Sequence, residues 1–210
     1  MEAPKKLVLA TRNPGKVREL RGPLSRFGFD VQGLPEDFPE TLETGTTFEE
    51  NALLKAHAAA RSLGLPVIAD DSGLEVDALG GAPGVHSARY GDDWPGKEGE
   101  TRDQRNNRRL LDALRGVPES RRTAHFHCCM VMVWPSASFE ELVAHGVWEG
   151  RITECARGEN GFGYDPLFLD PELGRTGAEL SREEKMARSH RARALKRLLE
   201  TLERRNAQQD

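Results

Sequence analysis

Apolar positions in the N-terminal part of this chain follow first a strand pattern and then a helical one. The apolar run of residues 6–10 predicts a short buried strand, and the polar residues 11–16 predict a tight loop. A helix should come next, because apolar side chains recur at helical spacing at Val17, Leu20, Leu24 and Phe27. Gly22-Pro23 should end or kink this helix early. Another strand is expected over residues 31–34.

A capping box predicts where the second helix starts. Thr47 and Glu50 have the spacing of that motif, so the helix should begin at Phe48, and Gly64 should end it. An apolar run over residues 65–69 then predicts a second buried strand. Four residues follow directly after its carboxyl end: Asp70, Asp71, Ser72 and Gly73. Polar residues that emerge there are typical of the ligand sites of α/β proteins.

The second half of the chain continues the alternation of helices and strands. Residues 101–115 predict a charged helix, and β-branched or aromatic residues predict strands over 124–134, 142–148, 151–156 and 166–169. Ser181 and Glu184 form a second capping box, which should open a C-terminal helix with a buried stripe at Leu195, Leu198, Leu199 and Leu202. With no internal repeat or long linker, the pattern predicts one α/β domain over residues 1–210.

Composition and charge bear on whether the protein binds nucleic acid, spans a membrane or is secreted. Thirty basic against thirty-four acidic residues give a net charge of −4, so the molecule as a whole carries no electrostatic footprint for nucleic acid. The arginine-rich stretch 102–109 is better explained as a solvated helix face. No apolar run approaches the roughly 18 residues of a membrane span, and the N-terminus lacks a signal-peptide pattern. The three cysteines lack CxxC spacing, which favours reduced core thiols and a cytoplasmic protein.

Two loops carry residues suited to a metal-bound phosphate chain. Residues 11–16 combine a helix start with a hydroxyl, an amide and the Lys16 ammonium, as an anion site requires, although a polar turn capped by Asn13 fits equally well. Asp70 and Asp71 place two carboxylates together, and a cation or a raised pKa should relieve their repulsion. Magnesium suits such oxygen ligands, and Glu43 or Glu40 could add another. Solvated acids in an Asx turn are the alternative.

Further polar residues could extend such a site. Asn51 and Lys55 share one helix face, although a solvated lysine is the simpler interpretation. Residues 162–165 place an aromatic ring beside a carboxylate, suited to stacking a base, whereas a core Phe and a turn Asp are the alternative. Three basic residues near the last helix could reach a base or a phosphate, or form a solvated basic face: Lys185, His190 and Arg191. His125-x-His127 lacks a convincing third metal ligand.

Six short motifs follow one another along residues 7–202. They are Leu9-Ala10-Thr11-Arg12-Asn13-Pro14-Gly15-Lys16, Phe48-Glu49-Glu50-Asn51-Ala52, Ala69-Asp70-Asp71-Ser72-Gly73-Leu74, Gly80-Gly81-Ala82-Pro83-Gly84, Gly161-Phe162-Gly163-Tyr164-Asp165-Pro166 and Ser189-His190-Arg191. In this order and spacing they resemble the inosine/xanthosine triphosphate pyrophosphatase family. Each motif is weak alone, but their order and spacing across nearly the whole chain make the resemblance specific.

The resemblance implies a fold, a reaction and a set of roles. It implies a homodimer with a long twisted mixed sheet flanked by helices, two lobes with a cleft between them, and magnesium-dependent hydrolysis of noncanonical purine nucleoside triphosphates to the monophosphate and pyrophosphate. By the same resemblance Asp71 would bind metal and act as general base, and Glu43 would be the second metal ligand. Residues matched to substrate binding are Thr11, Arg12, Asn13, Pro14, Gly15, Lys16, Ser72, Phe162, Gly163, Tyr164, Asp165, Lys185, His190 and Arg191.

Three other functions stay open at this point. A pyrophosphatase of canonical or pyrimidine triphosphates would carry the same motifs, because the shape of the base pocket is not visible in a sequence. A nucleotide-binding sensor would need the phosphate loop but not the acidic residues. A nucleic-acid protein that uses the arginine-rich helices is disfavoured by the net charge of −4.

Overall fold

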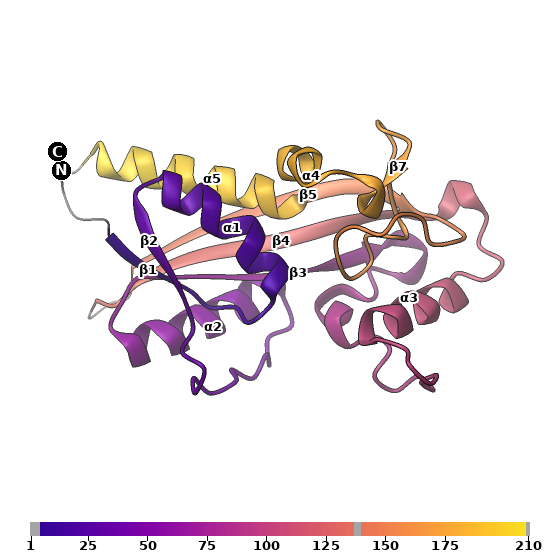
Figure 1. Ribbon diagram of the computed structural model, residues 1–210, viewed down its shortest axis with the longest axis horizontal. Coiled ribbons are helices and arrows are strands. Elements are labelled where there is room, and N and C mark those ends of the chain that lie inside the picture. The colour runs from indigo at the N-terminus through magenta and orange to yellow at the C-terminus, as the bar shows by residue number, and fades with distance from the viewer. Residues whose placement is uncertain (1–4, 137–139, 209–210) are drawn as a thin grey trace. The chain divides into compact units, whose positions relative to one another are not determined.

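The computed structural model describes residues 5–136 and 140–208, and these residues form a seven-stranded mixed sheet with helices on its faces (Figure 1). The strand order is β2-β1-β3-β4-β5-β6-β7. Residues 1–4, 137–139 and 209–210 are not among the described residues, and the prediction of one domain over 1–210 lies outside the described residues at these positions. The mixed α/β sheet predicted from the sequence is confirmed.

The described chain divides into two units, and each is built around part of the sheet. The first contains residues up to 71, 128–146 and from 191 onward; the second contains residues 72–127 and 147–190. Three strands contribute residues to both units, namely β3 (Val67–Val76), β4 (Thr123–Trp134) and β5 (Glu140–Ile152). The cleft expected between two lobes stays a prediction.

Parallel strands form the start of the first unit. Strand β1 (Lys5–Leu9) lies between β2 (Phe29–Gly33) and β3, parallel to both, with Leu7 opposite Val31 and Val8 opposite Val67. Each parallel pair requires a crossover connection. Helix α1 (Pro14–Arg26) supplies the first crossover, and α2 (Phe48–Leu63) lies in the second.

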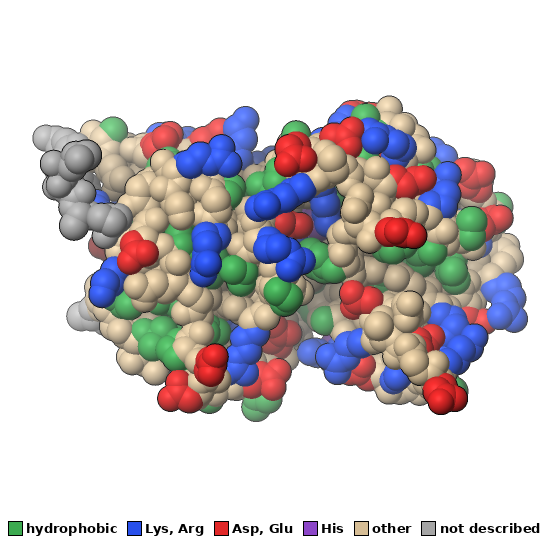
Figure 2. All heavy atoms as spheres, in the orientation of Figure 1, with side chains coloured by type: hydrophobic (Ala, Val, Ile, Leu, Met, Phe, Trp, Pro, Cys, Tyr) green, Lys and Arg blue, Asp and Glu red, His purple; other side chains and the backbone are tan. Residues whose placement is uncertain are grey.

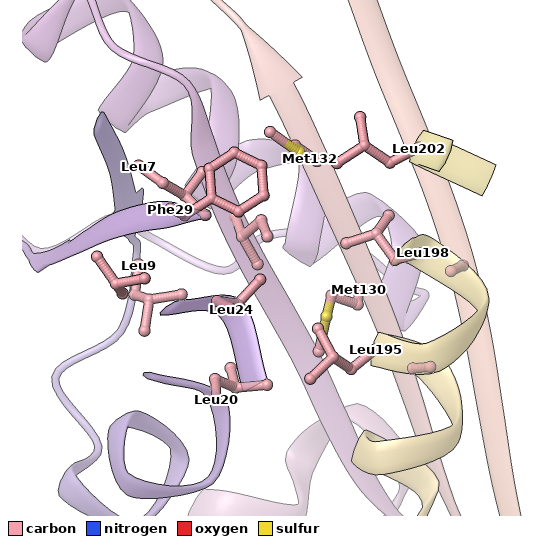
Figure 3. Close-up of a cluster of buried hydrophobic side chains, with 14 of the residues drawn as sticks. Leu7, Leu9, Leu20, Leu24, Phe29, Met130, Met132, Leu195, Leu198 and Leu202 are labelled. Carbon is pink, nitrogen blue, oxygen red and sulfur yellow. The ribbon is translucent and has the colours of Figure 1, made fainter. Parts of the chain in front are cut away.

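The helices α1 and α5 (His190–Asn206) cover one face of these strands, and α2 lies on the other face (Figure 1). A continuous apolar cluster packs α1 and α5 against the sheet, as Figure 3 shows; its side chains include Leu7, Leu9, Leu20, Leu24, Met130, Met132, Leu195, Leu198 and Leu202. The alanine-rich side of α2 is buried, with Ala52, Ala56, Ala59 and Ala60 fully inaccessible to solvent. Small side chains there allow the helix to approach the sheet closely.

The second unit combines the remaining parts of β3, β4 and β5 with short elements around an aromatic core. These elements are α3 (Arg102–Ala113), α4 (Arg182–Arg188), β6 (Phe168–Asp170), β7 (Arg175–Thr176) and short 3₁₀ helices at Asp77–Leu79, Gly84–Arg89, Glu119–Arg121 and Gly177–Glu179. Strand β6 pairs antiparallel with β5 and with β7. Phe126, Trp148 and Phe168 pack together in the core, and the Trp148 indole donates to Asp170 at 3.0 Å.

Several expected boundaries are confirmed and several are wrong. Helix α2 begins at Phe48 and ends before Gly64, with the predicted capping box and a left-handed Gly64. The expected end of the first helix at Gly22-Pro23 is wrong: the helix continues to Arg26, because Leu24 is fully buried in the apolar cluster and holds the last turn in place. Packing therefore outweighs the backbone hydrogen bond that Pro23 removes. The kink expected there as the other outcome stays a prediction.

Two further corrections concern strand ends. The strand predicted to continue over 151–156 ends at Ile152, and the predicted strand over 166–169 begins only at Phe168. The expected C-terminal helix is two helices, because Ser189 has an extended backbone that ends α4 before α5 begins at His190.

Surface charge is mixed. Acidic and basic side chains are interspersed on the face that Figure 2 shows, in line with the near balance of charges in the sequence. Among the helices of residues 5–136 and 140–208, none combines the length and the hydropathy that a transmembrane span requires.

Candidate active site

Asp70 and Asp71 lie in the middle of β3 rather than at its carboxyl end, so the predicted strand end after Ala69 is wrong. Adjacent aspartates disfavour a strand, but here the strand continues because the apolar residues Leu74 and Val76 are buried beyond them. Successive side chains of a strand point to opposite faces. The two carboxylates therefore have different neighbours, and neither relies on the other's protonation to relieve repulsion.

Asp70 belongs to the face of the sheet that α1 and α5 cover. Its Oδ2 atom contacts Lys16 Nζ from α1 at 2.9 Å and Arg191 Nε from α5 at 3.2 Å. Arg191 also contacts Glu19 of α1 at 2.8 Å through Nη1. Asp70 and Arg191 are almost fully buried, at 2% exposure each. Two helices and a strand are thus joined by one charged network.

Electrostatics keep Asp70 ionised. Burial opposes ionisation, but the positive charges of Lys16, Arg191 and Lys55 outweigh it and hold the pKa of Asp70 far below its usual range. The same network raises the pKa of Arg191 despite its burial, because Asp70 and Glu19 stabilise the guanidinium. Both partners are therefore charged at neutral pH.

Asp71 faces α2 and has a different set of partners. Lys55 Nζ contacts Asp71 Oδ1 at 3.0 Å and Glu43 Oε1 at 2.8 Å, so one ammonium bridges two carboxylates. The Asn51 amide donates to Asp71 Oδ2 at 3.2 Å. Asn51 is fully buried, and its Oδ1 atom accepts the Gly45 amide at 2.8 Å. These contacts bring the predicted metal ligands Asp71 and Glu43 to one cation.

Asp71 is less acidic than Asp70. Burial raises its pKa, the Lys55 charge counteracts the rise, and the nearby Glu43 carboxylate adds to it, with a net increase above the usual value. A carboxylate with a raised pKa is a better proton acceptor than an ordinary aspartate. The loop that carries Glu43 is held close by Gly45, where an added Cβ would lie 2.6 Å from Glu50 Cβ.

The predicted phosphate loop, residues 11–16, is organised by Asn13. The Asn13 side chain caps α1 by accepting the amides of Gly15 at 2.9 Å and Lys16 at 3.3 Å, and Pro14 occupies the first helical turn without an amide hydrogen. Thr11 Oγ1 accepts the Asn13 amide at 3.1 Å. The cap thus uses backbone donors that the sequence suggested for an anion. The charged donors of the loop are Lys16, which contacts Asp70, and Arg12.

Arg12 has a separate contact within the first unit. Its guanidinium donates to the carbonyl oxygen of Phe38 and lies 3.5 Å from that of Glu36. The side chain therefore links the loop to the proline-rich connector that precedes Glu43. A phosphate role for Arg12 stays a prediction.

Three of the predicted base-pocket residues meet in the second unit. Asp165 Oδ2 contacts Lys185 Nζ at 2.6 Å and accepts the Phe162 amide at 2.8 Å, while Lys185 Nζ lies 4.9 Å from the centre of the Phe162 ring. Lys185 is 8% exposed and Asp165 is 2% exposed. Gly161 permits this packing, because its φ is +79° and an added Cβ would lie 2.1 Å from Asp165 Oδ2.

Neighbouring residues fix the rest of this loop. Gly163 donates its amide to Asp103 at 2.7 Å, and its carbonyl oxygen accepts from Asn107 at 2.9 Å, so α3 anchors the loop. The Tyr164 ring lies in the core, where its hydroxyl donates to the Ser87 carbonyl oxygen at 2.8 Å. Burial raises the Tyr164 pKa well above its usual range. The Tyr164 side chain thus anchors the loop to the core of the second unit.

The basic residues near the last helices are not a solvated face, because Lys185, His190 and Arg191 are all buried. The His190 ring stacks on Phe126 in the second unit, with centroids 4.8 Å apart and planes within 14°. Arg191 contacts Asp70 and Glu19 in the first unit, which links it to the carboxylate network. Ser72 follows Asp71 on β3 and is partly exposed, and its contact with substrate stays a prediction.

Sequence reasoning gave too little weight to Asn51 and Lys55 and missed Glu19, Asp103 and Asn107. A signal for the first two was present, because Asn51 and Lys55 lie on the same helical stripe as the buried Phe48, Ala52 and Ala56. Polar residues on a buried stripe require partners. Glu19, Asp103 and Asn107 carry no such pattern, and their contacts arise only from the tertiary structure. His125 and His127 both contact Glu75, at 3.0 and 3.4 Å.

Together these features define an α/β protein with a buried acidic and cationic centre on strand β3 of its sheet. Comparison with known proteins identifies the family: the Ham1 family model matches residues 7–201, and the chain belongs to this family. A dITP/XTP pyrophosphatase of Nitratidesulfovibrio vulgaris is 58% identical over 197 residues, which cover 92% of this chain and 94% of that protein.

Solved structures show the same fold. The Ham1 protein of Staphylococcus aureus is 43% identical, with a TM-score of 0.80 over 95% of this chain and 98% of that one. A HAM1 protein from Coxiella burnetii is 41% identical, with a TM-score of 0.81 over 95% of this chain and 99% of that one. The sequence resemblance to this family is confirmed.

Asp70→Asn should destabilise the protein, because it removes the counter-charge of Lys16 and one of the two carboxylates that neutralise the buried Arg191. We expect a loss of about 3–5 kcal/mol in the free energy of unfolding at pH 7, measured by urea denaturation without divalent cations. The depressed pKa of Asp70 stabilises the folded state above about pH 4, and this stabilisation is lost as the pH falls. The free energy of unfolding of Asp70→Asn should therefore decrease less on acidification than that of the unsubstituted protein. Asp30→Asn, at an exposed site, is the control; equal stability of both variants would contradict the assignment.

Proposed function

We propose that this chain hydrolyses noncanonical purine nucleoside triphosphates, namely dITP, ITP, XTP and dXTP, to the nucleoside monophosphate and pyrophosphate. The observation that carries the proposal is the centre at Asp71, where a carboxylate of raised pKa faces Glu43 across the Lys55 ammonium. The relative from Nitratidesulfovibrio vulgaris, which is named a dITP/XTP pyrophosphatase, supports the choice of substrate. The proposed role of the enzyme is to remove these nucleotides from the pool.

Release of pyrophosphate requires cleavage between the α and β phosphates. In the proposed reaction a water oxygen attacks the α-phosphorus in line with the bond to the bridging oxygen, which leaves with pyrophosphate. Asp71 orients the water and accepts its proton, and the raised pKa of Asp71 suits that transfer. Asn51 holds Asp71 Oδ2, so the second oxygen of the carboxylate keeps a fixed orientation.

Magnesium fits the donor set at this centre. Glu43 and Asp71 offer carboxylate oxygens, the ligands that Mg²⁺ prefers, and both already converge on one cation, the Lys55 ammonium. When bound there, the ion would neutralise phosphate charge and polarise the phosphoryl oxygens. Glu43 and Asp71 would hold it.

Selection of the base is proposed to depend on Lys185, Asp165 and Phe162. An ammonium only donates hydrogen bonds, so Lys185 suits the 6-keto oxygen of inosine or xanthine and offers nothing to a 6-amino group. Asp165 Oδ2 already accepts from Lys185 and from the Phe162 amide. An adenine amino group would therefore lack a partner on burial, which is the condition for strong rejection.

Assembly and location are proposed from the family resemblance. We propose a homodimer in the cytoplasm that binds a small-molecule nucleotide and neither nucleic acid nor membrane. The near balance of charges is in line with the lack of affinity for nucleic acid.

Turnover of dITP, XTP, dGTP and dATP with Mg²⁺, with pyrophosphate and orthophosphate measured separately, tests the proposed function. Pyrophosphate should come chiefly from dITP and XTP. Asp71→Asn should lower kcat by about 100-fold or more, because the water loses its proton acceptor. Glu43→Gln should weaken the dependence on Mg²⁺, whereas Glu40→Gln, at an exposed site on the same connector, should not. Orthophosphate as the product, or tight binding without turnover, would contradict the proposal.

Lys185→Met should reduce the preference for dITP over dATP by about tenfold, since the donor to the 6-keto group is removed. The ratio of the two kcat/KM values is the measurement, because both values come from one preparation and the fraction of folded protein cancels. Lys196→Met on the exposed face of α5 is the matched control. An unchanged ratio in Lys185→Met would remove Lys185 from base selection.

A further inference from the structure

Three side chains with metal-binding atoms meet in the first unit, and none of them belongs to the centre formed by Asp71, Glu43 and Lys55. They are Glu49 from the first turn of α2, Cys129 from β4 and His145 from β5. His145 Nε2 lies 3.1 Å from Glu49 Oε2 and 4.0 Å from Cys129 Sγ. The three ligand atoms all lie within 4.8 Å of one another.

The backbone around this cluster places it on the α2 face of the sheet. Cys128 belongs to the apolar cluster under α1 and α5, so its neighbour Cys129 points to the opposite face. Likewise Ala144 belongs to that cluster and His145 points away from it. Arg197 donates to the His145 carbonyl oxygen at 2.7 Å, which fixes the backbone at this point of β5. The place of Cys129 and His145 on this face therefore follows from the alternation of side chains along β4 and β5.

We propose that Glu49, Cys129 and His145 form a binding site for a zinc-like divalent cation, with a solvent molecule as the fourth ligand. In a tetrahedral zinc site, Zn–S and Zn–N bonds of about 2.3 and 2.05 Å give a sulfur to nitrogen separation of about 3.6 Å and a nitrogen to oxygen separation of about 3.3 Å. The distances of 4.0 and 3.1 Å are close to this geometry. Small side-chain rotations close the site.

The chemistry of the ligands selects zinc over magnesium. Thiolate and imidazole are ligands of Zn²⁺ and Co²⁺, whereas Mg²⁺ prefers oxygen. On binding, the Cys129 S–H bond breaks, its proton goes to solvent and the sulfur bonds to the metal. One thiolate and one carboxylate then balance the two charges of the ion. Burial raises the pKa of Cys129 to about 12, so without metal the thiol is protonated and adds no charge to the interior.

The three side chains of the cluster differ in their exposure to solvent. Cys129 is fully buried, while the side chains of His145 and Glu49 are 41% and 47% exposed. An ion from solvent can thus meet His145 and Glu49 first, and rotation of these two side chains would bring it to the buried sulfur. Bound metal would connect the first turn of α2 to β4 and β5, so it should raise the stability of the folded protein.

Cobalt absorption tests the site directly, because a thiolate ligand produces an intense charge-transfer band that oxygen ligands do not. Chelator-treated full-length protein, titrated with Co²⁺ alone, should show this band and tetrahedral visible bands at one equivalent. Both should be displaced by Zn²⁺. Cys129→Ala should abolish the charge-transfer band, and Glu49→Gln or His145→Gln should weaken Co²⁺ affinity at least tenfold. Glu49 is partly exposed, so its variant keeps the test valid even if the Cys129 variant folds poorly.

Matched control variants distinguish metal binding at this cluster from metal binding elsewhere on the protein. Cys155→Ser removes an exposed thiol and should leave the band unchanged. His57→Gln removes a second His–Glu contact between α2 and β5, at 2.7 Å to Glu141, and should also leave the band unchanged. Asp71→Asn should retain the band while losing turnover, so failure of the proposed reaction and failure of this site are distinguishable. A spectrum without charge transfer, or a band that survives Cys129→Ala, would overturn the proposal.

Discussion

The alternation of side chains along β3 is the constraint on which the site depends. Two adjacent carboxylates that lie about 4 Å apart on a flexible loop would repel each other by about 4 kcal/mol at an effective dielectric constant of 20. A strand removes that conflict by directing Asp70 and Asp71 to opposite faces. Each face then supplies its own cations, Lys16 and Arg191 on one side and Lys55 on the other.

The two faces give the two acids different partners and different acidities. Asp70 is buried and held ionised by cations from α1 and α5, so it joins three elements and fixes the position of Lys16. Asp71 is the less acidic of the two, and its Lys55 partner is shared with Glu43. The higher pKa of Asp71 supports the proposed chemical role of that residue, and the buried ion pairs of Asp70 support a structural role.

Much of this arrangement could be predicted from the sequence, and the remainder depends on tertiary contacts. The limits of α2 followed from local signals, Thr47 with Glu50 at one end and Gly64 at the other, because capping is a local interaction. The continuation of β3 through Asp70 and Asp71 could not be predicted, since it depends on the burial of Leu74 and Val76 in the folded protein and on cations far away in the chain. For the same reason Arg191 was grouped with Lys185 and His190, whereas its guanidinium contacts Asp70 and Glu19.

The position of the divalent ion tests the assignment of the two acids most directly. A crystal structure with Mn²⁺ and a dITP analogue whose α–β bridge resists hydrolysis would locate the ion by its anomalous signal. The account predicts a peak about 2.1–2.3 Å from carboxylate oxygens of Asp71 and Glu43, with Asp70 still in contact with Lys16 and Arg191. A peak coordinated by Asp70 would contradict it, because the division of β3 into a structural face and a chemical face would then be wrong.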